Sequence, residues 1–290
     1  MQIPPSVQPV PSNNDNRTVS IPFGDLCPGT LISRPNRFLA VVDLNNKIVE
    51  AHVPDPGRLE ELLFAGNNVM VRRAEFNPKF NSRTRKTAYD LVLAAFKDIW
   101  VCIDTRYPND IFEIAVREKA LEDFRKYTEI HREVTFERAM KLIDPKKGTN
   151  SSHSAYLPKD GQRNYDARKT PKSRFDFLLL GPKSQPFLVE VKSVNLCVDG
   201  TGLFPDAPTK RGARHVRELL NLLSEGIDTG VLFIAQREDV TQVSAHRQMD
   251  PEFALALDEA QEAGVKIMAY RCVASQNELR LDPQPIPYAK

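Results

Sequence analysis

The sequence SRFDFLLL at residues 173–180 is followed, after the break GPKSQP at residues 181–186, by FLVEVKS at residues 187–193. Two apolar runs separated by Gly and Pro are typical of a strand hairpin. Because side chains alternate along a strand, Glu190 and Lys192 share one face, and the valines at positions 189 and 191 share the other. Pairing of the two strands would bring Asp176 beside Glu190 and Lys192. The hairpin therefore predicts a compact cluster of two carboxylates and one lysine.

This cluster of three side chains has a definite chemical use. Two carboxylates offer the oxygen ligands that hold Mg2+ beside a phosphate, and a nearby ammonium group orients water or stabilises developing negative charge. Phosphodiester cleavage would fit such a set of residues. The alternative is an edge hairpin in which Glu190 and Lys192 are solvated while Asp176 caps the strand or pairs with Arg174. The residues by themselves leave both interpretations open.

The bulk composition is that of an ordinary globular protein. The 290 residues suit one large domain or two ordinary ones, and 41% of them are hydrophobic and 27% charged. The formal net charge is only +2, so a role with nucleic acid must depend on local basic patches.

The cysteines and the apolar runs indicate a cytoplasmic protein. The four cysteines are far apart and contain no CxxC pair, which argues against a zinc site or a disulfide framework and suits a reducing compartment. No apolar run approaches the length of a membrane span, and no signal peptide is recognisable, so we expect no membrane partner.

The N-terminal half is predicted to be rich in short strands. Residues 1–18 hold four prolines among Ser, Asn and Gln, and we expect them to form a flexible tail. Asn45-Asn46 is a hairpin turn signal, and closely spaced strands over residues 19–106 favour a small Greek-key barrel of the OB type. The expected strands cover residues 26–33, 37–43, 47–52, 68–73, 89–96 and 100–104.

Residues 52–63 form a Pro-Gly turn followed by leucines. Leucines at positions 59, 62 and 63 predict a short helix that packs on the barrel. His52, Asp55 and Arg58 are candidates to hold a ligand near this loop; the alternative is that they cap and brace the turn.

A basic segment with interleaved aromatic residues follows. Cations for phosphates and rings for bases occur together in nucleic-acid grooves, although a solvated basic loop would look similar. The candidate phosphate contacts are Arg72, Arg73, Arg83, Arg85 and Lys86.

The C-terminal half begins with a predicted helix at residues 109–126, with Asn109 or Asp110 as its N-cap, and a strand at residues 129–136 that contains Glu133. Its composition then changes, because residues 138–174 hold ten Lys or Arg against three Asp. We expect a basic insertion over about residues 137–172 that lies on an anionic partner or is simply tolerated at the surface.

A second basic group is expected at a helix start. Thr209 can cap a helix that runs to about Ser224, and its first turns carry cations that oppose the macrodipole, a cost that a bound anion would offset. The alternative is a surface helix without a ligand. An apolar strand at residues 230–236, a helix at 251–263 and a strand at 265–270 complete a mixed α/β sheet flanked by helices. The cations at the helix start are Lys210, Arg211, Arg214 and His215.

Several of these stretches together resemble the sugar fermentation stimulation protein family (SfsA). The resemblance rests on residues 52–63, 173–180, 189–196, 204–220 and 250–270, in that order. It implies an N-terminal OB-like barrel, a restriction-endonuclease-like α/β domain of the PD-(D/E)xK type over residues 107–275, a C-terminal tail at 276–290, and DNA binding.

The same resemblance implies roles for individual residues. Asp176 and Glu190 would be ligands of Mg2+ or Mn2+, Lys192 would be the catalytic lysine, and Glu133 is a weaker candidate. Arg211 and His215 would be phosphate contacts.

Three functions remain open from the sequence. The first is a DNA-binding protein with a metal-dependent phosphodiesterase (nuclease) site, the second is a non-catalytic DNA-binding regulator of sugar metabolism genes, and the third is an RNA-processing factor. The expected partner is DNA, contacted mainly through its phosphates, and self-association into a homo-oligomer is left open.

Overall fold

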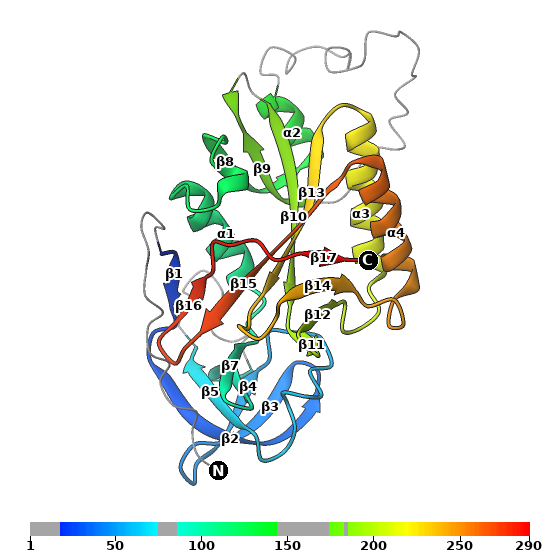
Figure 1. Ribbon diagram of the computed structural model, residues 1–290. Helices are drawn as coiled ribbons and strands as arrows, with labels where there is room; N and C mark the ends of the chain where they lie inside the picture. Colours follow the sequence, from blue (N-terminus) through cyan, green and yellow to red (C-terminus); the bar gives the residue numbers. More distant parts are fainter. Residues whose placement is uncertain (1–17, 75–85, 144–173, 183–184) are drawn as a thin grey trace.

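The computed structural model describes residues 18–74, 86–143, 174–182 and 185–290. A barrel at one end of the molecule adjoins an α/β sheet that carries two long helices along one side (Figure 1). No helix among the described residues is long and apolar enough to cross a membrane.

The barrel is closed by five strands. They are β2 (Leu26–Asn36), β3 (Leu39–Asp43), β4 (Ile48–His52), β5 (Asn68–Arg73) and β6 (Tyr89–Phe96). Antiparallel neighbours run in the order β4-β3-β2-β5-β6, and a parallel pairing of β4 with β6 closes the ring. The predicted OB-like barrel is thus confirmed. The Asn45-Asn46 turn has φ of 53° and 69°, as a tight hairpin turn requires.

The short helix expected after the Pro-Gly turn is absent. Residues 60–62 form a hydrogen-bonded turn instead, because Leu59 adopts a left-handed φ of 50° that a helix cannot include. Its side chain, like those of Leu62 and Leu63, is nevertheless buried in the barrel core. The spacing of the leucines therefore predicted correctly that they are buried, but wrongly that they form a helix.

The second half of the chain forms a mixed sheet. Its strands are β8 (Glu129–Thr135), β9 (Arg174–Leu180), β10 (Pro186–Val194), β13 (Asp228–Ala235) and β15 (Lys266–Ala274). The last three are parallel to one another, and β8 and β9 run antiparallel along the edge. Strand β7 (Ile99–Cys102) pairs with both β6 and β15, so one continuous sheet links the two halves.

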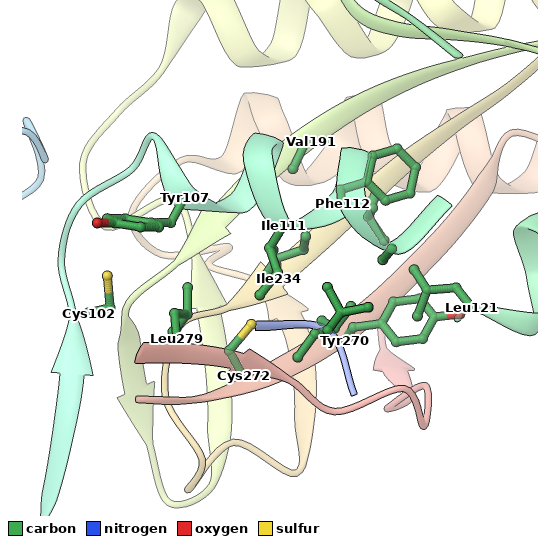
Figure 2. Close-up of a cluster of buried hydrophobic side chains, with 14 of the residues drawn as sticks. Cys102, Tyr107, Ile111, Phe112, Leu121, Val191, Ile234, Tyr270, Cys272 and Leu279 are labelled. Carbon is green, nitrogen blue, oxygen red and sulfur yellow. The ribbon is translucent and has the colours of Figure 1, made fainter. Parts of the chain in front are cut away.

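Helices cover both faces of this sheet. On one face α3 (Lys210–Ser224) and α4 (Pro251–Ala263) pack over β10 and β13, as predicted. On the other face lies α1 (Tyr107–Arg117), which buries Ile111 and Phe112 against Ile234, Tyr270 and Cys272 (Figure 2). Val191 points into this second core, so the side chains of Glu190 and Lys192 are directed toward α3.

Two helix boundaries differ from expectation. Helix α1 begins at Tyr107, with Pro108 in its first turn, and ends at Arg117, because Lys119 takes a φ of 57° before the 3-10 turn η2 (Glu122–Phe124). Asn109 is therefore inside the helix rather than its cap. Helix α2 (Phe136–Ile143) occupies the start of the expected basic insertion because its apolar residues are buried; the remainder of that insertion, residues 144–173, lies outside the described residues.

The last residues are part of the fold rather than a tail. Strand β16 (Glu278–Leu281) pairs with β15 and with β1 (Ser20–Pro22), and buries two leucines in the core. Strand β17 (Tyr288–Ala289) joins a small sheet with β11 (Leu196–Val198), β12 (Thr201–Phe204) and β14 (Gln242–Ala245). The composition of residues 276–290 hid this role because the strands are short and separated by proline.

Candidate functional site

The β9–β10 hairpin positions Asp176. The strand pairing extends from Leu180 opposite Pro186 to Phe177 opposite Val189, and stops there. At the next position a side chain takes the place of the backbone partner: Asp176 Oδ2 accepts a hydrogen bond from the Val191 N–H at 2.8 Å. Asn109 Nδ2 of α1 lies 3.5 Å from Asp176 Oδ1. The carboxylate is thus fixed from both β10 and α1.

Glu133 is not brought into this cluster. Strand β8 pairs Arg132 with Phe177 and Val134 with Phe175, and Glu133 between them has a φ of 51°. Its carboxylate forms an ion pair with Arg174, and both side chains are more than half exposed. Because Arg174 pairs with Glu133, the alternative in which it neutralises Asp176 is wrong.

Glu190 is the centre of the site and is only 3% exposed. Its Oε1 lies 2.6 Å from Lys192 Nζ and 2.5 Å from His215 Nδ1 of α3. Arg211 Nε donates to His215 Nε2 at 3.3 Å, so the ring proton on Nδ1 is the one directed at Glu190. The hairpin is therefore not a solvated edge.

The second oxygen of this carboxylate has no such partners. Glu190 Oε2 is buried and accepts no hydrogen bond from any described residue. A buried carboxylate oxygen without a donor carries a desolvation cost, and a bound cation would remove that cost. This open position lies in the same cluster as the Asp176 carboxylate.

The two carboxyl groups differ in their pKa values. Burial raises the pKa of Asp176 to about 6, and the negative charge of Glu190 adds to that rise. Burial also acts to raise the pKa of Glu190, but Lys192 and His215 outweigh it and the pKa falls to about 2. Near neutral pH the pair can therefore present two anionic oxygen donors to a cation.

These residues fit a small divalent cation. The part of the chain that the structure describes has no group of three or more His, Cys, Asp or Glu side chains arranged around a metal position. Mg2+ is nonetheless often bound by only two protein carboxylates, while waters and substrate phosphates fill its other coordination positions. Asp176 and Glu190 would be those two carboxylates.

The start of α3 places cations around the carboxylates. Thr209 caps the helix as predicted, and its Oγ1 accepts from the Gly212 N–H at 3.0 Å. Lys210, Arg211 and Arg214 are exposed, whereas His215 is buried against Glu190. His215 is thus placed to position a carboxylate rather than to contact phosphate, because its helical phase turns it toward β10.

The predicted basic segment of the barrel divides into two kinds of residue. Arg72 braces the fold, since its guanidinium donates to the Tyr107 hydroxyl at 2.6 Å and lies 3.8 Å from Asp104. Arg73 and Lys86 are exposed, and Arg83 and Arg85 lie outside the described residues.

The Pro-Gly loop braces the junction between the two halves. Asp55 is buried, and its two oxygens accept from Gly57 N–H and Asn195 Nδ2, each at 2.7 Å. Burial raises the pKa of Asp55 to about 6, with a further contribution from Asp206. His52 Nδ1 lies 3.2 Å from the Phe38 carbonyl oxygen, while Arg58 is exposed.

Three residues of these networks were missed from the sequence. Asn109 and Asn195 are ordinary polar residues whose partners are far away in the chain. Arg237 is fully buried, with its guanidinium 4.4 Å from the Phe96 ring centroid and bonded to the Asn195 carbonyl oxygen at 2.8 Å. A charged residue directly after the apolar strand of residues 230–236 was the available signal for Arg237.

Two family models match the chain. The SfsA N-terminal OB domain matches residues 32–103, and the sugar fermentation stimulation protein RE domain matches residues 149–278. Their order and positions agree with the barrel and with the mixed sheet.

Individual relatives cover nearly the whole chain. A sugar fermentation stimulation protein homolog of Clostridium botulinum is 35% identical over 251 residues, which is 87% of this chain and 92% of the relative. A homolog of Alkaliphilus metalliredigens is 34% identical over 90% of this chain and 96% of its own length. The structure of Pyrococcus furiosus SfsA in complex with Ca2+ superposes with a TM-score of 0.73 at 25% identity, covering 93% of this chain and 98% of that one. The chain therefore belongs to the sugar fermentation stimulation protein (SfsA) family.

Proposed function

We propose that this protein binds DNA and cleaves phosphodiester bonds with the help of a divalent cation held by Asp176 and Glu190. The observation that carries the proposal is the Glu190 carboxylate, which is buried with Oε1 bonded to Lys192 and His215 and with Oε2 left without a donor. A bound cation would offset the cost of burying that oxygen, and the neighbouring Asp176 carboxylate supplies a second oxygen ligand.

Each residue of the cluster would have a distinct task. Mg2+ or Mn2+, when bound, would lower the pKa of a bound water and offset the charge of the phosphate. Lys192 Nζ, beside Glu190 Oε1, would orient the attacking water or stabilise charge that develops on the phosphate. His215 would hold Glu190 in place, and the exposed Arg211 would contact a neighbouring phosphate.

The Pyrococcus furiosus relative supports a role for a divalent cation in this fold. The printed description of the Pyrococcus furiosus structure names Ca2+ as its ligand. Calcium and magnesium both take oxygen ligands, and carboxylates are prominent among them. Asp176 and Glu190 form a buried pair of carboxylates in the matching fold.

The helix start supports an anionic partner. Lys210, Arg211 and Arg214 are exposed at the N-terminus of α3, where positive side chains oppose the helix dipole unless an anion is bound. A phosphate backbone would be held there next to the carboxylates. Because such contacts release counterions, affinity for DNA should fall steeply with salt.

A cleavage assay tests the proposal. The protein would be incubated with supercoiled, linear, single-stranded and overhang DNA in Mg2+ or Mn2+, beside Asp176→Asn and Glu133→Gln. We expect products from the wild type and from Glu133→Gln, since that carboxylate lies outside the cluster, and none from Asp176→Asn. Equal product from all three proteins would show a contaminating nuclease and contradict the proposal.

Binding measurements with the same protein distinguish the two alternative functions. Salt-dependent DNA binding that survives Glu190→Gln, with no product that depends on Asp176, would indicate a regulator that binds without cutting. Stronger competition by RNA than by DNA of one sequence would indicate an RNA-processing factor.

A further inference from the structure

A pocket of about 380 Å3 lies where the barrel meets the start of α3. The tip of the β2–β3 hairpin, the Pro-Gly loop and residues 207–208 form its walls. Three arginines and one glutamate line it, so its charged side chains favour an anion. They are Arg34, Arg37, Arg58 and Glu60.

Arg34 builds the pocket rather than serving as a free cation. Its guanidinium donates to the carbonyl oxygens of Gly57 at 2.7 Å and Arg37 at 2.9 Å, and it also bonds to the Arg58 carbonyl oxygen. These bonds tie the hairpin tip to the Pro-Gly loop. The backbones of Arg37 and Arg58 are thereby held together, and both residues line the pocket.

Arg37 and Arg58 are available for a ligand. Both are exposed, and neither forms an ion pair within the described part of the chain. Guanidinium groups bind phosphate through paired N–H donors, so two of them around one pocket suit a phosphodiester backbone.

An exposed aromatic residue follows the pocket residue Arg37 in the chain. Phe38 follows Arg37 at the hairpin tip, and its side chain is 50% exposed although large apolar side chains are usually covered. Asn36 Oδ1 accepts from the Phe38 N–H at 2.9 Å and so fixes the tip. Cations with a neighbouring exposed ring are the arrangement by which proteins bind unpaired nucleotides, with a base stacked on the ring.

The pocket lies next to the start of α3 in the chain. Pro208 lines the pocket and lies directly before Thr209, the cap of α3, and His215 of that helix contacts Glu190. The helix from Lys210 to His215 is about 8 Å long, so only a short stretch of chain separates the pocket wall from Glu190. A strand held at the pocket could therefore extend along α3 to the carboxylates.

We propose that Arg37, Arg58 and Phe38 form a binding site for an unpaired strand of nucleic acid that leads into the Asp176–Glu190 site. This deepens the proposed function by naming its substrate class, DNA with a single-stranded segment. The arginines hold its phosphates, and Phe38 stacks on a base that a blunt duplex keeps inside its helix.

Binding without cleavage tests this site. Fluorescence anisotropy would measure the Kd of the full-length protein in EDTA for a labelled 12-nucleotide strand, a duplex with a single-stranded overhang and a blunt duplex. We expect Phe38→Ala to weaken single-strand binding about tenfold, because base stacking on an aromatic ring is lost. Arg37→Ala and Arg58→Ala should each lower the slope of log K against log salt by about 0.7.

Matched controls lie at the opposite end of β3. Lys47 and Ile48 are exposed at the next hairpin turn, so Lys47→Ala and Ile48→Ala should bind like the wild type. Wild-type affinity in all three pocket variants, or an equal loss for blunt duplex and single strand, would overturn the assignment, as would the absence of any nucleic-acid binding. Because EDTA removes the cation, a failed cleavage assay with intact, Phe38-dependent binding would refute only the catalytic proposal.

Discussion

Two buried aspartates, Asp176 and Asp55, have similar pKa values but different neighbouring groups. Burial raises the pKa of both Asp176 and Asp55 to about 6. Asp55 has one uncharged donor on each oxygen, from Gly57 and Asn195. Both aspartates lie near a second carboxylate with one oxygen that has no donor among the described residues, Glu190 Oε2 beside Asp176 and Asp206 Oδ2 beside Asp55. Only the carboxylate beside Asp176 is bonded to a lysine and a histidine. Neither a raised pKa nor a carboxylate oxygen without a donor therefore identifies a functional carboxylate by itself; the lysine bonded to Glu190 is what distinguishes the Asp176 site.

The largest expected difference between the two aspartates is in catalysis. Asp176→Asn should lower metal-dependent DNA cleavage about 1000-fold or more, because a metal ligand is lost. Asp55→Asn should leave the rate within about threefold, since that residue braces a loop. Single-turnover cleavage of one DNA substrate by both variants measures this. Similar losses from both substitutions would show that the loop contributes to the reaction.

Calcium gives a readout that does not depend on turnover. A cation that binds only the folded protein raises its Tm with concentration. We expect CaCl2 to raise the Tm of the wild type and of Asp55→Asn but not that of Asp176→Asn. A calcium response that persists in Asp176→Asn would place the cation elsewhere.

The next largest effect concerns stability at the Glu190 pair. Lys192→Met removes the ammonium group 2.6 Å from a carboxylate that is 3% exposed. Breaking a buried ion pair leaves an uncompensated charge and costs about 3 kcal/mol. Urea unfolding at pH 7 would measure the loss, and Lys210→Met at the exposed helix start should change stability by less than about 0.5 kcal/mol. Equal stability of the two variants would mean that Glu190 is solvated.

The sequence predicts the cluster around Asp176 better than the contacts of Asp55, and the reason is physical. The cluster of Asp176, Glu190 and Lys192 follows from strand periodicity and a short hairpin, so local rules suffice. The bond between Asp55 and Asn195 joins residues 140 positions apart, and no local pattern encodes it. The barrel, the mixed sheet and the cap of α3 were predictable for the same local reason.

Side-chain direction was the harder part of the site. The basic helix start was identified from composition, but which of its cations faces Glu190 depends on the phase of α3 over the sheet. Arg211 and Arg214 turn outward while His215 turns inward. Strand β16 was missed because it has only four residues, although it pairs with the preceding strand β15 as well as with β1 at the other end of the chain.

A smaller effect is expected in the pH dependence of stability. Asp55 binds its proton with a pKa of about 6 in the folded protein, against 3.8 as the ordinary value. The folded state therefore holds more protons than the unfolded state between pH 4 and 6, and stability falls as pH rises through that window. The shift corresponds to at most about 3 kcal/mol.

Urea unfolding from pH 4 to 6.5 measures this, and Asp55→Asn should flatten the curve. Asp176 contributes in the same direction, so the slope that remains in Asp55→Asn should decrease further in the double variant with Asp176→Asn. Glu190, with its pKa lowered to about 2, acts in the opposite direction at the acid end of this window, because its stabilisation is lost as pH falls through its ordinary value of 4.5. An unchanged slope in Asp55→Asn would show that Asp55 titrates normally.

The smallest expected effect concerns Asn195, the hydrogen-bond donor to Asp55 at the junction between the two halves. Asn195→Ala removes the donor 2.7 Å from Asp55 Oδ2 and should cost about 1–2 kcal/mol, because a buried acceptor loses its partner. Asn221→Ala on the exposed face of α3 is the matched control. The Asn195 bond lowers the pKa of Asp55, so its removal should raise that pKa further and steepen the fall of stability between pH 4 and 6. A loss of stability without a steeper pH dependence would mean that the Asn195 side chain supports Gln236 rather than the Asp55 carboxylate.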